Sequence, residues 1–281
     1  MKFSKGFTLI ELLIAIFFFS ILGTAITTMY IKNTHISTAQ TEVVHTQLNL
    51  RATADYLGME IRMAGFNNEL PTAESLDPTD SSPKILTATD SQFRFTIHDD
   101  KSGTLRDIDI RLRPSQDTDN DGIADDNGAD LCIQFGGAGG YQTIAEDIQA
   151  VSFAYGYDDD DIDSAVELYT STGGINEIVW AIPDPAGSGN WMRLDANGDG
   201  AINEDDDTDN DNLLNLVNTG TAVNIGKIRA VRVTLLGTSE YKDHDYSNNA
   251  SYVVGQHVIK PGDKIRRRIL TSIVQCRNLR R

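Results

Sequence analysis

Residues 195–206 hold the side chains best suited to chemistry, because their oxygen atoms recur with the spacing of a metal-binding loop. Oxygen ligands stand at loop positions one, three and five, a backbone carbonyl is available at seven, and a carboxylate closes the loop at twelve. In order, these positions are Asp195, Asn197, Asp199, Ala201 and Asp206. Gly200 at position six permits the sharp turn that directs alternate residues inward. This spacing predicts a single Ca²⁺ site.

A second acidic stretch, 117–126, carries a less complete set of ligands. Its candidates at positions one, three, five and nine are Asp117, Asp119, Asp121 and Asp125. Position twelve is a glycine, so the closing ligand has to come from Asp126 or Asp130. We expect a second Ca²⁺ here on the same grounds of oxygen spacing.

A third stretch begins at residue 207 and repeats the string DTDND without the glycine. Its carboxylates, Asp207, Asp209 and Asp211, could add ligands to the preceding loop or form a weaker site of their own. An acidic, solvated surface is the alternative reading for all three stretches. If ions bind, we expect them to order long loops rather than to catalyse a reaction.

Two of these stretches resemble known calcium loops. Residues 195–206 are similar to dockerin-type loops, which accept Asp at position twelve where a bidentate Glu is usual. Residues 117–125 resemble the calcium repeats of thrombospondin-like extracellular proteins. Both resemblances imply a structural ion.

The acidic charge of the chain is local. The 281 residues have a formal net charge of −17, and 20 of the 41 acidic residues lie in 117–130, 158–167 and 195–211, which contain no Lys or Arg. A protein that binds nucleic acid needs a basic face for phosphate, so we expect no such partner.

The amino terminus predicts insertion into a membrane. Residues 12–31 are uncharged and would extend about 30 Å as a helix, enough to cross a bilayer. Lys2 and Lys5 come before this segment, and the positive-inside tendency keeps their end cytoplasmic and the head outside. Glu11 lies at the edge of the apolar segment, where a carboxylate is costly and usually has a partner.

The string GFTLIE, from Gly6 to Glu11, resembles the prepilin signal of type IV pilins and type II secretion pseudopilins. The resemblance implies that a prepilin peptidase cleaves between Gly6 and Phe7 and that the new amino group of Phe7 is methylated. It also implies that Glu11 pairs with the amino terminus of a neighbouring subunit during filament assembly.

The remaining pattern predicts an α+β, pilin-like fold. Apolar or small residues recur at helical spacing at Ile36, Val43, Leu50, Ala54, Leu57, Ile61 and Ala64, and Gly65 follows as a left-handed cap. We therefore expect one long helix over 7–64, packed by its second half on an antiparallel β-sheet head with long acidic loops. The strand-like runs are 92–97, 108–113, 144–157, 178–182, 228–236 and 270–276. The expected parts are a leader (1–6), a membrane or filament-core segment (7–31), an amphipathic half-helix (32–66) and the head (67–281).

Cys132 and Cys276 both follow the membrane segment, so a disulfide between them could persist outside the cytoplasm. Two buried thiols on separate strands are an equally good reading, because sequence gives no distance between them.

Three other stretches resemble the PilW-like minor pilins, and the first of them also resembles the J-type pseudopilins, which are typically shorter. They are LGMEIRMAGF, ending at Phe66, KIRAVRVTLL at 227–236, and RRRILTSIVQCRN at 266–278. The resemblance implies a minor pilin of the inner membrane that joins the priming or tip complex of a type IV pilus. Its implied partners are other minor pilins, the major pilin, the prepilin peptidase, the inner-membrane assembly platform and a large tip protein.

Two alternatives stay open at this point. One is a J-type minor pseudopilin of a type II secretion system, and the other is a calcium-dependent tip adhesin. None of the metalloprotease, nucleophile-elbow or phosphate-loop motifs occurs, so we expect no enzymatic activity.

Overall fold

The computed structural model describes residues 8–66, 84–99, 104–126, 128–136, 139–159, 165–276 and 278. The chain divides into two compact units, residues 1–45 and residues 46–281. The second unit is called the head below. Each unit is described separately.

One helix, α1 (Leu9–Arg62), runs from the first unit into the second. It ends two residues before the predicted position, and Gly65 follows with a φ of 76°, as expected for a left-handed cap. The positions of α1 buried in the head are Thr46, Leu50, Thr53, Ala54, Leu57, Gly58 and Ile61. The predicted apolar stripe is therefore confirmed from Leu50 onward.

The earlier part of that stripe is different. Ile36 is 56% exposed and belongs to the first unit, which extends to residue 45. Packing of the predicted segment 32–45 on the head stays a prediction.

The head is built on a ten-stranded antiparallel sheet. Its strands are β1 (Ile85–Ala88), β2 (Phe93–Asp99), β3 (Thr104–Leu112), β4 (Ala129–Phe135), β5 (Gln142–Tyr157), β8 (Ala181–Pro183), β9 (Asn190–Arg193), β10 (Val217–Ala222), β11 (Ile228–Thr238) and β14 (Arg267–Gln275). Strands β1 to β5 pair in sequence order. The long β5 also pairs with β11, which pairs with β14, and Tyr155 of β5 pairs with β8, which leads to β9 and β10.

Two small hairpins and two 3₁₀ turns complete the head. The hairpins are β6 (Leu168–Thr170) with β7 (Asn176–Ile178), and β12 (Tyr252–Val254) with β13 (His257–Ile259). The turns are η1 (Glu204–Asp206) and η2 (Ile225–Lys227). Five of the six predicted strands are confirmed in place, whereas the run 178–182 is divided between the end of β7 and β8.

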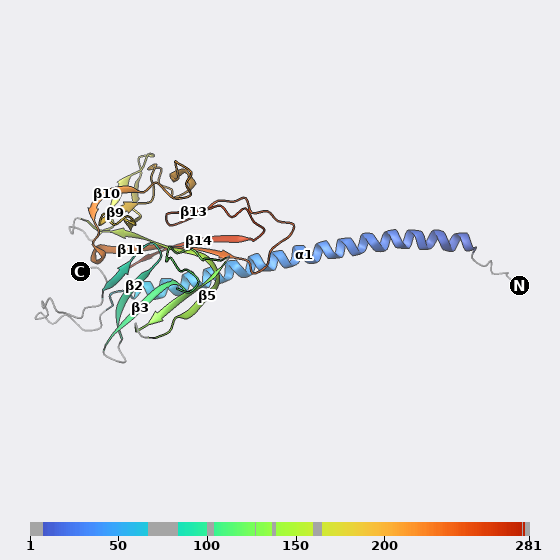
Figure 1. Cartoon of the computed structure of the whole chain (residues 1–281), viewed down its shortest axis with the longest axis horizontal. Helices are drawn as coiled ribbons and strands as arrows, with labels where there is room; N and C mark the ends of the chain where they lie inside the picture. Colours follow the sequence, from blue (N-terminus) through green and yellow to red (C-terminus); the bar gives the residue numbers. More distant parts are fainter. Residues whose placement is uncertain are drawn as a thin grey trace, which may run out of the picture. The chain divides into compact units, whose positions relative to one another are not determined.

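Alternation of side chains lets β5 and β11 bury both of their faces. Phe153 and Val231 point into the large cluster that contains Leu50 and Leu57 of α1. On the other face, Ala154 and Ala230 pack with side chains from outside the ten-stranded sheet, among them Trp180, Leu214 and Val258 of β13. Figure 1 shows β11 and β14 lying side by side, with the segment that carries β9 and β10 near one end of them. The acidic stretches lie in two connections, 117–125 between β3 and β4, and 195–215 between β9 and β10.

The cysteines are two buried free thiols, so the disulfide alternative is wrong for this structure. Cys132 lies on β4, and Cys276 follows β14 directly. Strands β5 and β11 lie between β4 and β14, which places the two about three strand spacings, roughly 14 Å, apart across the sheet. A disulfide needs Cα atoms about 4.4–6.8 Å apart.

Candidate functional site

The start of α1 is fixed by Thr8 and Glu11. The Thr8 backbone N–H and hydroxyl donate to Glu11 Oε2 at 2.8 and 2.9 Å, and the Glu11 N–H donates back to Thr8 Oγ1 at 3.3 Å. This reciprocal arrangement is a capping box. It holds the Glu11 carboxylate at the amino end of the helix. The predicted cleavage site, Gly6 and Phe7, lies outside the described residues.

Within the described chain, α1 is long and apolar enough to cross a membrane. Its first part presents large apolar side chains to its surroundings, including Phe17, Phe18 and Phe19. A soluble domain rarely exposes such a continuous apolar surface, so this segment needs lipid or other protein around it.

Three acidic loops share one backbone conformation and are called loop A (117–125), loop B (195–206) and loop C (207–215). Loop positions four and six have positive φ in all three: Asn120 60° and Gly122 86°, Gly198 74° and Gly200 89°, Asn210 59° and Asn212 69°. The carboxylate at position one also accepts the N–H of position six, in the pairs Asp117–Gly122 (3.3 Å), Asp195–Gly200 (3.0 Å) and Asp207–Asn212 (3.1 Å). Loop C therefore has the fold of the other two, with Asn212 where they have glycine.

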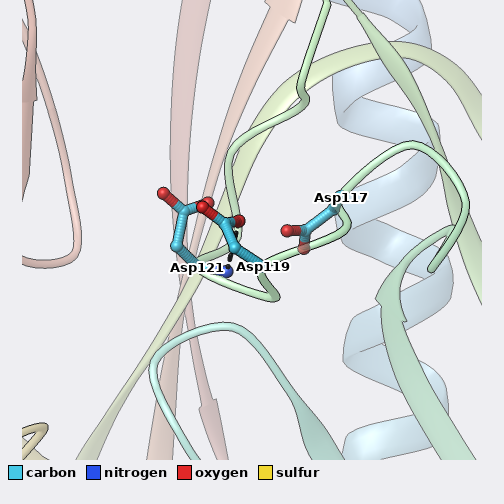
Figure 2. Close-up of side chains that lie close together, drawn as sticks. All are labelled: Asp117, Asp119 and Asp121. Atoms are coloured by element: carbon cyan, nitrogen blue, oxygen red, sulfur yellow. Dashed lines mark hydrogen bonds between the residues drawn. The ribbon is translucent and has the colours of Figure 1, made fainter.

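In loop A, the three predicted carboxylates come together. Asp117, Asp119 and Asp121 each offer an oxygen within 4.8 Å of the others, and Figure 2 shows Asp119 and Asp121 side by side with Asp117 facing them. Asp117 is only 1% exposed, and its Oδ1 accepts no hydrogen bond from the described residues. Burial, reinforced by the charge of Asp121, raises the pKa of Asp117 to about 6. A divalent cation would supply the missing partner for this buried oxygen.

The other candidate ligands near loop A lie outside the cluster of three carboxylates. The Thr118 N–H donates to Asp125 Oδ2 at 3.2 Å, which keeps Asp125 at the rim of the loop. Asp126 is exposed. Asp130 is wrong as a closing ligand, because it lies on β4 and pairs with Arg113 at 2.8 Å.

Loop B is closed by its last residue. Asp206 is fully buried, and its Oδ1 accepts the N–H groups of Ala196 and Asn197 at 2.7 and 3.1 Å. Position twelve of the loop thus lies against positions two and three. Burial raises the pKa of Asp195, and the nearby charge of Asp206 adds to the shift. Asn197, Asp199 and Ala201 occupy positions three, five and seven as predicted, with the Ala201 N–H donating to Asp199 Oδ1 at 2.8 Å.

Loop C forms its own cluster. Asp207, Asp209 and Asp211 have oxygens within 4.8 Å of one another, so they gather together rather than around loop B. The Thr208 N–H donates to Asn215 Oδ1 at 2.5 Å, which repeats the Thr118–Asp125 bond of loop A. Sequence reasoning missed Asn215, although DTDNDNLLN aligns with DTDNDGIAD over nine residues.

The turn at Asp90 and Ser91 joins loops A and C. The Ser91 hydroxyl donates to the Asn120 carbonyl of loop A at 2.7 Å. Asp90 Oδ2 accepts the Gln256 N–H at 3.3 Å, and the Gln256 carbonyl accepts the N–H of Leu214 in loop C at 2.7 Å. Burial raises the pKa of Asp90 to about 7. No sequence signal marks Asp90, because its partners are more than 60 residues away along the chain.

The chain is similar to known pilus proteins in both sequence and structure. Residues 125–278 match the family described as Type IV Pilus-assembly protein W, and residues 1–27 match the prokaryotic N-terminal methylation motif. A type IV-like pilin from Thermus thermophilus is 12% identical, with 83% of this chain and 97% of that chain covered at a TM-score of 0.39. No curated protein sequence matches the chain.

The methylation motif lies at the start of an apolar helix, and the later part of that helix packs on an antiparallel sheet. This combination defines a pilin-type protein. The match over 125–278 is more specific and covers more than half of the chain. The chain belongs to the PilW family of type IV pilus assembly proteins.

Proposed function

We propose that the chain is a non-enzymatic minor pilin that enters the priming or tip complex of a type IV pilus through its amino-terminal helix. The observation that carries this proposal is the joint presence of the PilW match, the methylation motif and a helix long enough to span a membrane. Before assembly, the head lies outside the cytoplasm and α1 holds the protein in the inner membrane. Prepilin peptidase, the assembly platform and other pilins are its partners.

The assembly step depends on Glu11. Cleavage after Gly6 leaves the amino group on Phe7, directly before Thr8, the first residue of the capping box with Glu11. A carboxylate in an apolar filament core is costly unless a cation pairs with it. The amino terminus of the neighbouring subunit supplies that cation, so pairing selects one register of helix packing.

The test is incorporation of a Glu11→Gln variant into pili. We expect the variant to be processed and to reach the membrane but to be absent from sheared pili on immunoblots. Asp55→Asn, an exposed carboxylate on the same helix, is the matched control and should assemble normally. Normal assembly of Glu11→Gln would reject the pairing mechanism.

We further propose that Ca²⁺ bound in loops A, B and C orders the head. The support is the shared loop conformation and the unpartnered, buried Oδ1 of Asp117. Each loop places carboxylate oxygens at alternate residues, which is the ligand type and spacing that Ca²⁺ prefers. The role is structural, because the ion in loop A would supply the partner that the buried Oδ1 of Asp117 lacks.

The PilW match favours a type IV pilus over the J-type pseudopilin of a secretion system. Gene neighbours test this choice directly. Minor pilin genes together with a gene for a large tip protein support the pilus, whereas secretin and secretion-ATPase genes would support the pseudopilin.

A further inference from the structure

A cavity of about 290 Å³ opens in the head where the end of β5 meets β6, β9 and β10. The cavity lies apart from α1. Loop A contributes no side chain to it. Its volume is at the lower end of the range of small-molecule sites, which suits a single ring rather than an extended chain.

The floor of the cavity is rigid. The Tyr157 ring stacks on Trp191 with 5.0 Å between ring centroids and 8° between planes, and both side chains are buried. Burial raises the pKa of Tyr157, whose hydroxyl is bonded to Thr219 and Thr221 on β10. A floor fixed in this way needs no rearrangement to receive a ligand.

One wall carries a cation with unused hydrogen-bonding capacity. The guanidinium of Arg193 lies over the Tyr169 ring, 4.3 Å from its centroid. Its Nε–H is buried and has no partner among the described residues. The buried Nε–H is closed off from the cavity, so a ligand would meet the terminal N–H groups of the guanidinium instead.

The other lining groups determine the class of ligand. Among the described residues, Asp159 and Glu167 line the cavity with Arg193, so this part of the lining carries both carboxylates and a guanidinium, with a formal charge of −1. Asn218 and Thr221 add an amide and a hydroxyl, while Leu168, Val179 and Val217 provide apolar surface. An anionic ligand would be repelled by two carboxylates. A neutral ring with hydroxyls on one side and C–H groups on the other fits this lining. Its hydroxyls would meet the polar side chains and its C–H groups the apolar ones.

We propose that this cavity binds one neutral sugar residue of a glycan. The inference goes beyond assembly into a pilus, because it assigns the head a ligand that no step of assembly requires.

Loop B supports the cavity wall. The Thr172 hydroxyl, in the turn between β6 and β7, donates to the Asn197 carbonyl of loop B at 3.3 Å. Arg193 lies two residues before Asp195, the first residue of that loop. If loop B holds Ca²⁺ as proposed above, removal of the ion loosens both β6 and β9, and sugar binding falls with it.

Saturation-transfer NMR tests the proposal on the full chain in lauryldimethylamine oxide, a detergent without a sugar headgroup. The probes are galactose, mannose and N-acetylglucosamine, each titrated in the presence of Ca²⁺. We expect at least one sugar to bind, and Arg193→Lys and Asn218→Ala each to weaken its binding at least tenfold. Arg268→Lys, an exposed arginine on β14, is the matched control and should bind as the unchanged protein does.

Folding of each variant is checked by its melting temperature. Absence of transfer to every sugar in a folded, Ca²⁺-loaded protein would overturn the proposal, as would equal binding by both cavity variants. Saturation transfer to a basic peptide in place of the sugars would also overturn it. Glu11→Gln should retain sugar binding, so failure of the assembly mechanism and failure of the sugar site are distinguishable.

Discussion

The backbone N–H of Asn212 donates to Asp207 Oδ2 at 3.1 Å, with Asn212 at a φ of 69°. The same bond joins Gly122 to Asp117 in loop A at 3.3 Å. Asparagine enters the left-handed region more readily than other residues with a side chain, so it replaces glycine here at low cost. Loop C is thus a complete copy of the loop A backbone despite its missing glycine.

This equivalence predicts the effect of substitutions at residue 212. Asn212→Val should lower the free energy of unfolding by about 1–3 kcal/mol, because a β-branched residue is strained at positive φ. Asn212→Gly should leave stability within about 0.5 kcal/mol. Thermal unfolding of the two variants without Ca²⁺ gives the comparison, and equal melting temperatures would show that the left-handed conformation is not required.

Removal of calcium should destabilise the head. At a free Ca²⁺ concentration about 1,000 times the Kd, one site adds about 4 kcal/mol to the free energy of unfolding. For a unit of this size, each kcal/mol corresponds to roughly 2–4 °C in melting temperature. We therefore expect a fall of several degrees in excess EDTA, recovered by added Ca²⁺ and not by Mg²⁺. An unchanged melting temperature would exclude a structural ion.

Asp117→Asn should act in opposite directions with and without metal. With Ca²⁺ present, the variant should bind one ion fewer than the unchanged chain and melt at a lower temperature. In EDTA, it should melt at the same temperature or higher, because the amide removes an uncompensated buried charge. Asp126→Asn, an exposed neighbour, should change neither value. A lower melting temperature of Asp117→Asn in EDTA would contradict the absence of a partner at Oδ1.

The metal-free head should be more stable at pH 5 than at pH 7. Burial raises the pKa of Asp117 to about 6 and that of Asp90 to about 7, both above the value of about 3.9 in an unfolded chain. Between these values the folded state binds more protons, so stability falls as pH rises. Two groups act oppositely. Burial lowers the pKa of His257, which adds stability as pH rises, and the pKa of Asp263 is lowered chiefly by its hydrogen bond to Arg267, a contribution lost only below about pH 4.

Melting temperatures between pH 5 and pH 7, on protein stripped of metal by dialysis, measure this effect. The trend should weaken in Asp117→Asn. A melting temperature that rises steadily from pH 5 to pH 7 would contradict the burial of these carboxylates.

Leu57→Ala should test the packing of α1 on the sheet. Leu57 has no exposed surface, and its truncation should cost about 2–5 kcal/mol of unfolding free energy. Met59→Ala on the same helix is 64% exposed in the unchanged chain and should cost under about 0.5 kcal/mol. Denaturant titration of the full chain in detergent compares them, and similar losses would mean that α1 does not pack as described.

Much of the fold follows from local patterns in the sequence. The stripe at Leu50, Leu57 and Ile61 becomes buried because residues three or four apart share one helix face. The loop conformation follows equally from short spacing, since a carboxylate reaches an N–H only five residues away in each loop. The sequence left open whether the carboxylates of loop C join loop B or form a cluster of their own, and it did not single out Asn215.

What the sequence determined alone was therefore the amino-terminal motif, the helix and the spacing of acids within each loop. Only the tertiary structure decided that two strands separate β4, which carries Cys132, from β14, which Cys276 follows, that Asp90 bridges two loops, and that Arg193 meets Tyr169 at a cavity. The reason is physical. Helix faces and loop ligands are set by neighbours within about twelve residues, whereas strand order depends on the burial of both faces of β5 and β11, which no local stretch specifies.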